Sequence, residues 1–138
     1  MTVLHRGGCL CGRVRYEVTE EPYRVGVCHC LDCRKHHAAI FRAFAILPET
    51  GFRLAGETRT FEHTNGTLRH FCPTCGSPVC QTNPGSDVTE IFLGSLDEPD
   101  RLRPTYELWM GRREGWLPPL DVPRHYEFNR GGKGRTEP

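Results

Sequence analysis

The 138-residue sequence lacks any apolar run that approaches the roughly 20 residues needed for a membrane-spanning helix. It also lacks an excess of either charge, since 18 Lys and Arg stand against 17 Asp and Glu, a formal net charge of +1. Nucleic-acid binding normally needs a basic face or stripe, so this balance argues against nucleic acid as the main partner. The first eight residues hold no apolar segment of the kind found in signal peptides. We therefore expect a cytoplasmic protein with no membrane partner.

Cysteine, in contrast, is abundant, with eight in the chain. In a reducing compartment disulfides are rare, and clustered cysteines more often bind metal or act in catalysis. A disulfide framework is the alternative, but cysteines in a Cys-x-Cys spacing do not readily bridge to each other. Seven of the eight fall into three groups, which are Cys9 and Cys11; Cys28, Cys30 and Cys33; and Cys72 and Cys75. The grouping predicts metal sites.

The first and last groups together predict a closed four-sulfur site for structural zinc. Cys9 and Cys11 lie two residues apart at the start of a predicted strand, so both sulfurs can point to one face. Cys72 and Cys75 flank a tight turn, and Gly76 permits a left-handed conformation just after the second cysteine. A structural zinc contributes on the order of 10 kcal/mol to folding. The alternatives are two pairs of buried free thiols, or iron–sulfur ligation.

The middle group, Cys28, Cys30 and Cys33, places three sulfurs within six residues and is followed at once by Arg34 and Lys35. Nearby positive charge favours thiolates over thiols. A zinc held by three protein ligands with one open position is typical of a catalytic site, whereas four protein ligands are typical of a structural site. This group therefore predicts a second, catalytic metal.

The fourth position of this second site could be filled by water, by a substrate sulfur or by another side chain. Cys80, His36 and His37 are the candidates. A lone cysteine is more often a small buried hydrophobic residue, and the histidines are more often surface or hydrogen-bonded groups. His29 lies between two ligands and is expected to point away from the metal if its segment is extended.

Most of the chain has the pattern of short strands. Strands are expected at residues 13–18, 23–30, 39–47, 78–82, 89–96 and 106–110, with a turn and short helix at 31–38. Residues 58–71 are expected to form a hairpin, in which Asn65 and Gly66 make a two-residue turn with positive φ at both positions. We expect one mainly β domain over residues 1–128, followed by a flexible Gly-rich, charged tail over 129–138.

Three cysteine motifs occur in a particular order along the chain. They are Gly8-Cys9-Leu10-Cys11-Gly12-Arg13, then Cys28-His29-Cys30-Leu31-Asp32-Cys33-Arg34-Lys35, and then Phe71-Cys72-Pro73-Thr74-Cys75-Gly76. Two later segments follow, Gly94-Ser95-Leu96-Asp97 and Tyr106-Glu107-Leu108-Trp109. Together they resemble the glutathione-dependent formaldehyde-activating enzyme family, also called the centromere protein V/GFA domain. The resemblance covers about residues 7 to 120.

The resemblance implies a β-tent fold of the Mss4-like type, with short antiparallel strands organised around zinc. It implies two zinc ions per chain, a structural one on Cys9, Cys11, Cys72 and Cys75 and a second one on the catalytic set Cys28, Cys30 and Cys33. The family's named activity condenses formaldehyde with glutathione to S-hydroxymethylglutathione and is classed as a carbon–sulfur lyase. The expected partner is thus a small thiol such as glutathione.

In this enzyme hypothesis, Arg34 and Lys35 favour an anionic substrate, and Asp32 or a nearby histidine carries the proton. A second hypothesis is a non-catalytic zinc module for protein or nucleic-acid partners, in which Cys80 or a histidine closes the second site. A third is a lyase for another small sulfur compound. The coordination of the second metal separates the first two hypotheses, and the sequence gives no information on oligomeric state.

Overall fold

The chain is built mainly from β-strands, as predicted, and the structure describes residues 1–132. In this computed structural model the chain divides into two compact units. The first unit comprises Met1–Arg24 and Ala45–Leu102, and the second comprises Val25–Phe44 and the chain from Arg103 onward. The domain boundary at residue 128 stays a prediction, and residues 133–138 of the expected tail lie outside the described residues.

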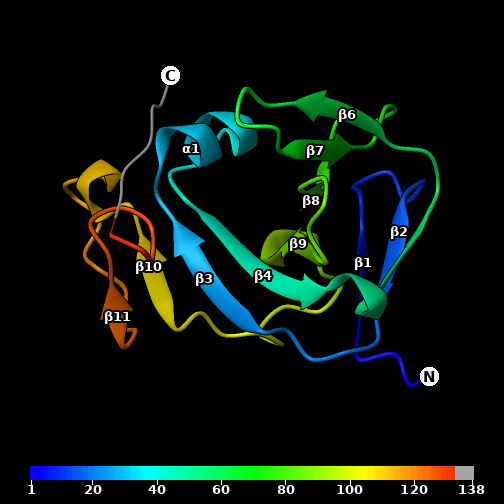
Figure 1. Ribbon diagram of the computed structural model, residues 1–138, viewed down its shortest axis with the longest axis horizontal. Coiled ribbons are helices and arrows are strands. Elements are labelled where there is room, and N and C mark those ends of the chain that lie inside the picture. Colours follow the sequence, from blue (N-terminus) through cyan, green and yellow to red (C-terminus); the bar gives the residue numbers. More distant parts are fainter. Residues whose placement is uncertain (133–138) are drawn as a thin grey trace. The chain divides into compact units, whose positions relative to one another are not determined.

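The first unit contains a three-stranded antiparallel sheet and a run of four antiparallel strands (Figure 1). The three-stranded sheet has the order β1-β2-β5, with β1 at His5–Gly8, β2 at Arg15–Val18 and β5 at Phe52–Ala55. The run has the order β6-β7-β8-β9, with β6 at Arg59–Glu62, β7 at Leu68–Phe71, β8 at Pro78–Thr82 and β9 at Val88–Phe92. Two short 3-10 helices, η1 at Glu49–Gly51 and η2 at Leu93–Ser95, connect strands.

The β6–β7 hairpin is present, but its turn is not the predicted two-residue type. Gly66 has a φ of +87°, whereas Asn65 is not among the residues with positive φ. The Gly66 amide donates to the His63 carbonyl at 2.8 Å, and the His63 amide donates to the Thr67 carbonyl at 2.8 Å. The Asn65 side chain accepts from the Thr67 amide at 3.0 Å. These bonds favour an ordinary tight turn followed by one left-handed glycine, a common three-residue hairpin connection.

Tyr16 and Val18 of β2 belong to the buried core of the first unit. Tyr16 is 1% exposed, and its hydroxyl lies 2.6 Å from the Ser95 hydroxyl. Gly7 is paired with Tyr16 across β1 and β2, and a Cβ at Gly7 would lie 2.4 Å from the Tyr16 hydroxyl oxygen. The Tyr16 hydroxyl and the Ser95 carbonyl therefore leave no room for a side chain at position 7, which shortly precedes Cys9.

The second unit combines strands with a short helix. Its elements are β3 at Arg24–Cys28, α1 at Leu31–His37, the start of β4 at Arg42–Pro48, β10 at Tyr106–Leu108, the 3-10 helix η3 at Met110–Arg112 and β11 at Arg124–His125. β10 pairs in parallel with both β3 and β11. α1 is the one α-helix within residues 1–132, and no helix there is long and apolar enough to cross a membrane.

The pairing of β3 with β10 sets the position of Cys28, the last residue of β3, relative to β10. Gly26 lies opposite Tyr106, and a Cβ at Gly26 would come within 2.6 Å of the Tyr106 ring. Because position 26 has no side chain, β10 can lie directly against β3. Two residues later the same pairing sets Cys28 opposite Leu108.

The predicted strands are all present, mostly with shorter ends, and the prediction for β8 coincides with the strand. Three strands were not predicted: β1, β5 and β11. β1 has the sequence His-Arg-Gly-Gly, which has low strand propensity and forms through its pairing with β2. β5 is exposed over three of its four residues, and β11 has only two residues, so neither carries an apolar alternation.

Candidate metal centres

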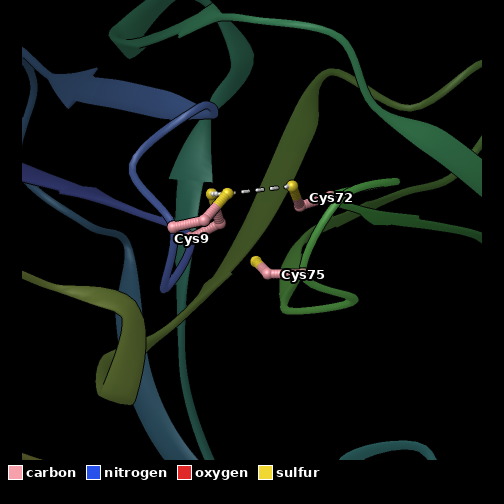
Figure 2. A group of neighbouring side chains, drawn as sticks. Cys9, Cys72 and Cys75 are labelled. Atoms are coloured by element: carbon pink, nitrogen blue, oxygen red, sulfur yellow. Dashed lines mark hydrogen bonds between the residues drawn. The ribbon is translucent and has the colours of Figure 1, made fainter.

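The first unit brings together Cys9, Cys11, Cys72 and Cys75, whose sulfur atoms all lie within 4.8 Å of one another (Figure 2). The Cys9 and Cys11 sulfurs are 3.6 Å apart, and the Cys11 and Cys72 sulfurs are 3.7 Å apart. A tetrahedron with zinc–sulfur bonds of about 2.3 Å has sulfur–sulfur edges of about 3.8 Å. The spacing and the all-sulfur donor set therefore fit a closed zinc site.

Backbone and hydroxyl groups support this four-sulfur set. The Val14 amide donates to the Cys9 sulfur at 3.2 Å. Ser77 connects the two turns, because its hydroxyl accepts from the Leu10 amide at 3.1 Å and lies 3.2 Å from the Cys75 sulfur. The hydrogen bond from Ser77 is the largest cause that lowers the pKa of Cys75, to about 5. Gly76 has a φ of +77°, which confirms the predicted left-handed residue after the second cysteine.

The second unit brings together the sulfurs of Cys28, Cys30 and Cys33, also within 4.8 Å of one another. Cys28 ends β3, Cys30 caps the N-terminus of α1, and Cys33 lies in the first turn of α1. The Cys30 sulfur accepts from the Cys33 amide at 3.4 Å. The three sulfurs thus converge where the end of β3 meets the start of α1. All three residues are buried, at 4%, 0% and 2% exposure.

The pKa values of Cys28 and Cys33 are both raised, although the contact with Cys33 by itself lowers that of Cys28. The contact with the Cys30 sulfur is the largest cause that raises the pKa of Cys28, to about 11, and Cys28 and Cys30 together raise that of Cys33. The buried Arg42 guanidinium acts in the opposite direction on both. Crowded thiols lose their protons readily only when a cation compensates the charge, so the donor set suits a metal ion.

Within residues 1–132, no other His, Cys, Asp or Glu ligand atom joins either sulfur group. His36, His37 and Cys80 lie outside both groups. Burial is the cause that raises the pKa of Cys80, to about 12, as expected for a small buried hydrophobic residue. In this structure none of the three side chains that the sequence offered places a ligand atom in the group of Cys28, Cys30 and Cys33.

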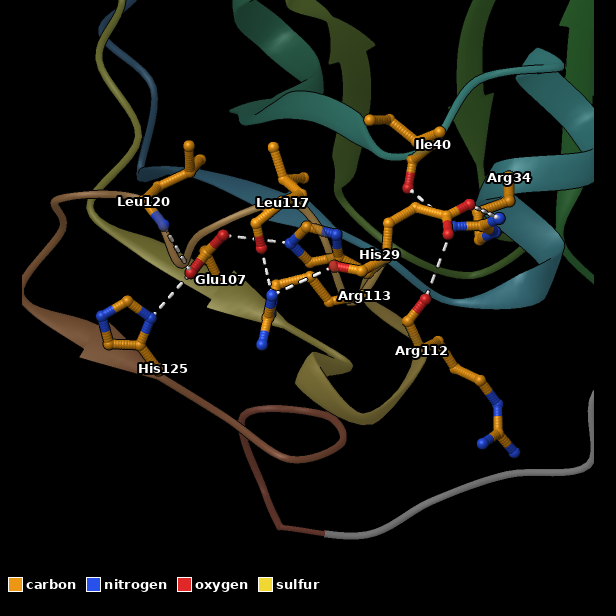
Figure 3. Close-up of polar contacts among 10 residues, drawn as sticks. His29, Arg34, Ile40, Glu107, Arg112, Arg113, Leu117, Leu120 and His125 are labelled. Atoms are coloured by element: carbon orange, nitrogen blue, oxygen red, sulfur yellow. Dashed lines mark hydrogen bonds and ion pairs between the residues drawn. The ribbon is translucent and has the colours of Figure 1, made fainter.

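His29 points to Glu107 instead of joining the sulfur group, in line with the expectation for an extended segment (Figure 3). Its Nε2 atom lies 3.0 Å from Oε1 of Glu107, and both side chains are fully buried. The other carboxylate oxygen of Glu107 accepts from the Leu120 amide at 3.2 Å and lies 2.7 Å from Nδ1 of His125. The sequence did not indicate this network, since Glu107 reads as the outward polar position of a short strand.

The two cations that follow the cysteines have different environments. Arg34 lies 2.6 Å from Glu114 and also donates to the carbonyl of Ile40 at 3.3 Å, so it ties α1 to neighbouring loops (Figure 3). Lys35 is exposed. A surface hollow of about 410 Å³ lies beside α1. It is lined by Leu31, Arg34, Lys35, Ala38, Ala39 and Ile40. Of the two, Lys35 is the cation directed to solvent.

Two clusters of converging cysteine sulfurs on a mainly β scaffold fit a zinc-binding domain. The sequence matches the family model described as glutathione-dependent formaldehyde-activating enzyme over residues 4–112. The chain belongs to this family. A crystal structure of a protein from Rhodobacter sphaeroides, determined by a structural genomics programme, is 21% identical and has a TM-score of 0.56. The match covers 69% of this chain and 90% of that one, and it shows a shared fold, consistent with the Mss4-like type.

Proposed function

We propose that the protein is a zinc-dependent enzyme of the carbon–sulfur lyase type. It joins a small thiol to formaldehyde, and in the reverse reaction it splits the product into thiol and formaldehyde. Cys9, Cys11, Cys72 and Cys75 would hold a structural zinc. Cys28, Cys30 and Cys33 would hold the second. Zinc bound at the second set would supply a soft Lewis acid whose free position suits a sulfur ligand.

The reaction needs neither an oxidant nor a reductant. In the forward direction the thiol sulfur forms a bond to the carbon of formaldehyde, the carbonyl π bond opens, and the proton lost by sulfur reaches the oxygen. The product is a hemithioacetal, and the reverse reaction breaks the same carbon–sulfur bond. Asp32, which is buried in the first turn of α1 next to Cys33 in sequence, or a nearby histidine would carry this proton.

The observation that carries the proposal is the contrast between the two sulfur groups. One offers four sulfurs, while the other offers three, and no further side-chain ligand joins it within the described part of the chain. Three protein ligands leave one position for a substrate, as catalytic zinc sites do.

Lys35 would favour anionic thiols such as glutathione. It is exposed on α1, the helix that begins at Cys30, whereas the charge of Arg34 is engaged by Glu114. A solvent-facing cation raises the local concentration of an anion and its rate of association, and this effect weakens as salt screens the charge. An anionic thiol should therefore react faster at low ionic strength, and an uncharged thiol should show little dependence on salt.

The test is an exchange experiment at equilibrium. Formaldehyde labelled with ¹³C is mixed with glutathione, N-acetylcysteine or 2-mercaptoethanol, and the exchange rate between free and thiol-bound carbon is measured by NMR with and without the zinc-loaded protein. We expect wild-type protein to accelerate exchange for at least one thiol, and the Cys30→Ser variant not to do so. Equal rates for wild-type protein, Cys30→Ser and buffer, across all three thiols, contradict the proposal.

A second candidate, the non-catalytic zinc module, is favoured by one observation, the burial of all three sulfurs of the second set. In that case a fourth protein ligand completes the site. X-ray absorption at the zinc edge separates the two, because a small thiol added to the protein changes the second zinc's coordination only if one position is exchangeable.

A further inference from the structure

His29 lies between Cys28 and Cys30 in the sequence, although it is not one of the three residues of the second set. Side chains in an extended segment alternate in direction, so His29 points to one side and the two cysteines to the other. His29 is 0% exposed and lies in contact with Glu107, not with the sulfurs. Whatever holds His29 in its direction therefore also sets the side from which the two sulfurs approach a metal.

β10 holds His29 through both its side chain and its backbone. Oε1 of Glu107 lies 3.0 Å from Nε2 of His29, and because a carboxylate only accepts, the ring N–H is the donor. The His29 amide donates to the Leu108 carbonyl at 3.1 Å. Leu108 in turn is paired with Cys28 in the β3–β10 ladder. The segment that carries two of the three sulfurs is thus anchored at successive residues to one strand.

Glu107 is itself fixed from its other side. Its Oε2 atom accepts from the Leu120 amide at 3.2 Å and lies 2.7 Å from Nδ1 of His125, and the whole residue is 0% exposed. Rotation of the carboxylate would leave the buried His29 ring N–H without a partner, at a cost of about 1–3 kcal/mol, and would also break the contacts with the Leu120 amide and His125. Figure 3 shows Glu107 between His29 on one side and Leu120 and His125 on the other. This arrangement is rigid on both sides of the bond to His29.

We propose that Glu107 is a positioning residue of the second metal centre, which acts through His29 to hold the Cys28 and Cys30 sulfurs in the direction that metal binding needs. The inference rests on the proposed metal role of Cys28, Cys30 and Cys33. When this bond is absent, the metal has to order the segment itself, and its affinity falls. Groups that orient metal ligands from one step away typically change metal affinity about 10–100-fold.

The test compares three single variants of the full chain. Glu107→Met removes the acceptor and keeps a similar volume. Glu107→Gln keeps a side-chain oxygen that can accept from His29. His125→Gln is the matched control, because it changes the partner of the other carboxylate oxygen and leaves the His29 bond in place. The second metal's affinity is measured by competition with a chromophoric chelator, and the cobalt-loaded proteins are compared by their visible spectra.

We expect Glu107→Met to bind the second metal about 10–100-fold more weakly, with the first metal unchanged and with altered cobalt bands from the three-sulfur site. Glu107→Gln should recover most of the affinity. His125→Gln should lower thermal stability and leave the second metal's affinity and spectrum as in wild-type protein. A role for Glu107 in general stability alone would lower stability in Glu107→Met and His125→Gln without this selective effect on one metal.

The inference is overturned if folded Glu107→Met binds the second metal as wild-type protein does, or if His125→Gln weakens it equally. If Glu107→Met does not fold, the His29→Met variant decides, since it removes the same bond and leaves Glu107 bound to Leu120 and His125. Wild-type binding at the second site in that variant also overturns the inference. Failure of the underlying metal assignment is distinct, because wild-type protein itself would then bind only one metal per chain.

Discussion

Nε2 of His29 and Oε1 of Glu107 lie 3.0 Å apart, and neither side chain has any exposed surface. The bond joins the middle of the Cys28–Cys30 segment to a strand almost eighty residues further along the chain. A buried carboxylate needs a full set of donors, and Glu107 has them in His29, His125 and the Leu120 amide. One buried side chain thus contacts His29, the Leu120 amide and His125 of the second unit.

Replacement of Glu107 by alanine should lower the free energy of unfolding by about 2–4 kcal/mol, because it leaves the buried His29 ring N–H unpaired and creates a cavity. His125→Ala should cost less, since His125 is 37% exposed at its side chain and water can take its place. Urea unfolding of the zinc-loaded proteins measures both values. Equal losses for the two variants would show that the His29 bond contributes nothing of its own.

The two sulfur groups should respond differently to the loss of one ligand. Cys30→Ser should lower the zinc content from about two to about one per chain while the fold survives, because the remaining four-sulfur site is complete without it. Cys75→Ser should unfold or aggregate the protein, because it opens the closed site of the first unit. Metal analysis and circular dichroism of both variants give the answer. An equal loss of stability in the two would remove the distinction between a structural and a catalytic site.

The ion pair of Arg15 with Asp97 should contribute only a little. The Arg15 guanidinium holds the pKa of Asp97 below its ordinary value, and both side chains are 43% exposed. For a carboxyl group whose folded pKa is lowered, the stabilisation is present above the unfolded pKa of about 3.9 and is lost as the pH falls through the folded value. Asp97→Asn should thus cost about 0.5 kcal/mol, constant from pH 8 to pH 5 and smaller in 1 M salt. A cost that changes steadily between pH 8 and pH 5 would assign it to another group.

Cys80 should behave as a buried neutral thiol. Burial raises its pKa to about 12. Burial of the neutral thiol therefore contributes fully to stability below the ordinary thiol pKa of about 8.5. This contribution is lost as the pH rises toward 12, because the thiol ionises in the unfolded chain first. Cys80→Val should therefore keep two zinc ions per chain and should lose less stability than wild-type protein between pH 9 and pH 11. If the variant binds only one zinc ion, Cys80 is the fourth ligand of the second site and the catalytic proposal fails.

Arg34 and Lys35 should have separable effects if the proposed reaction takes place. Arg34→Gln should reduce stability by about 1 kcal/mol through the loss of its pair with Glu114, which is only partly exposed. Lys35→Gln should leave stability unchanged and slow exchange for glutathione, but not for the uncharged 2-mercaptoethanol. Exchange rates for the two thiols in both variants provide the measurement. An equal reduction for both thiols in Lys35→Gln would exclude electrostatic attraction as its role.

Much of the fold followed from local patterns in the sequence. Alternation of apolar residues indicated the strands with a buried face, and Pro78 to Thr82 matched β8. The elements that were missed depend on contacts distant in sequence. β1 contains two glycines and forms because β2 lies beside it, and Asn65 takes a negative φ because its side chain bonds to Thr67. Such choices are made by tertiary structure and leave little trace in propensity.

The sulfur groups were predictable because cysteine spacing fixes which sulfurs can converge. The residues that hydrogen-bond to the cysteine segments could not be predicted in this way. Ser77 and Glu107 are ordinary polar residues whose roles depend on partners more than sixty positions away, Leu10 for Ser77 and His29 for Glu107. Arg34 and Lys35 were both expected to serve the substrate, yet the pairing of Arg34 with Glu114 depends on a loop eighty residues further on. A pattern of residue types within one segment does not contain this information.

The positions of the two sulfur groups along the chain imply an order of assembly. Cys28, Cys30 and Cys33 belong to one short segment, so they can capture a metal as soon as that segment is free to fold. Cys72 follows Cys11 by 61 residues, so the four-sulfur set forms only after a long loop has closed. The segment of the three-sulfur set is synthesised before the strand that carries Glu107, so under the proposed assignment it would meet metal first. Under the proposed assignment of two zinc ions, capture at the local set and closure of the distant set would compete for the same ions when metal is scarce.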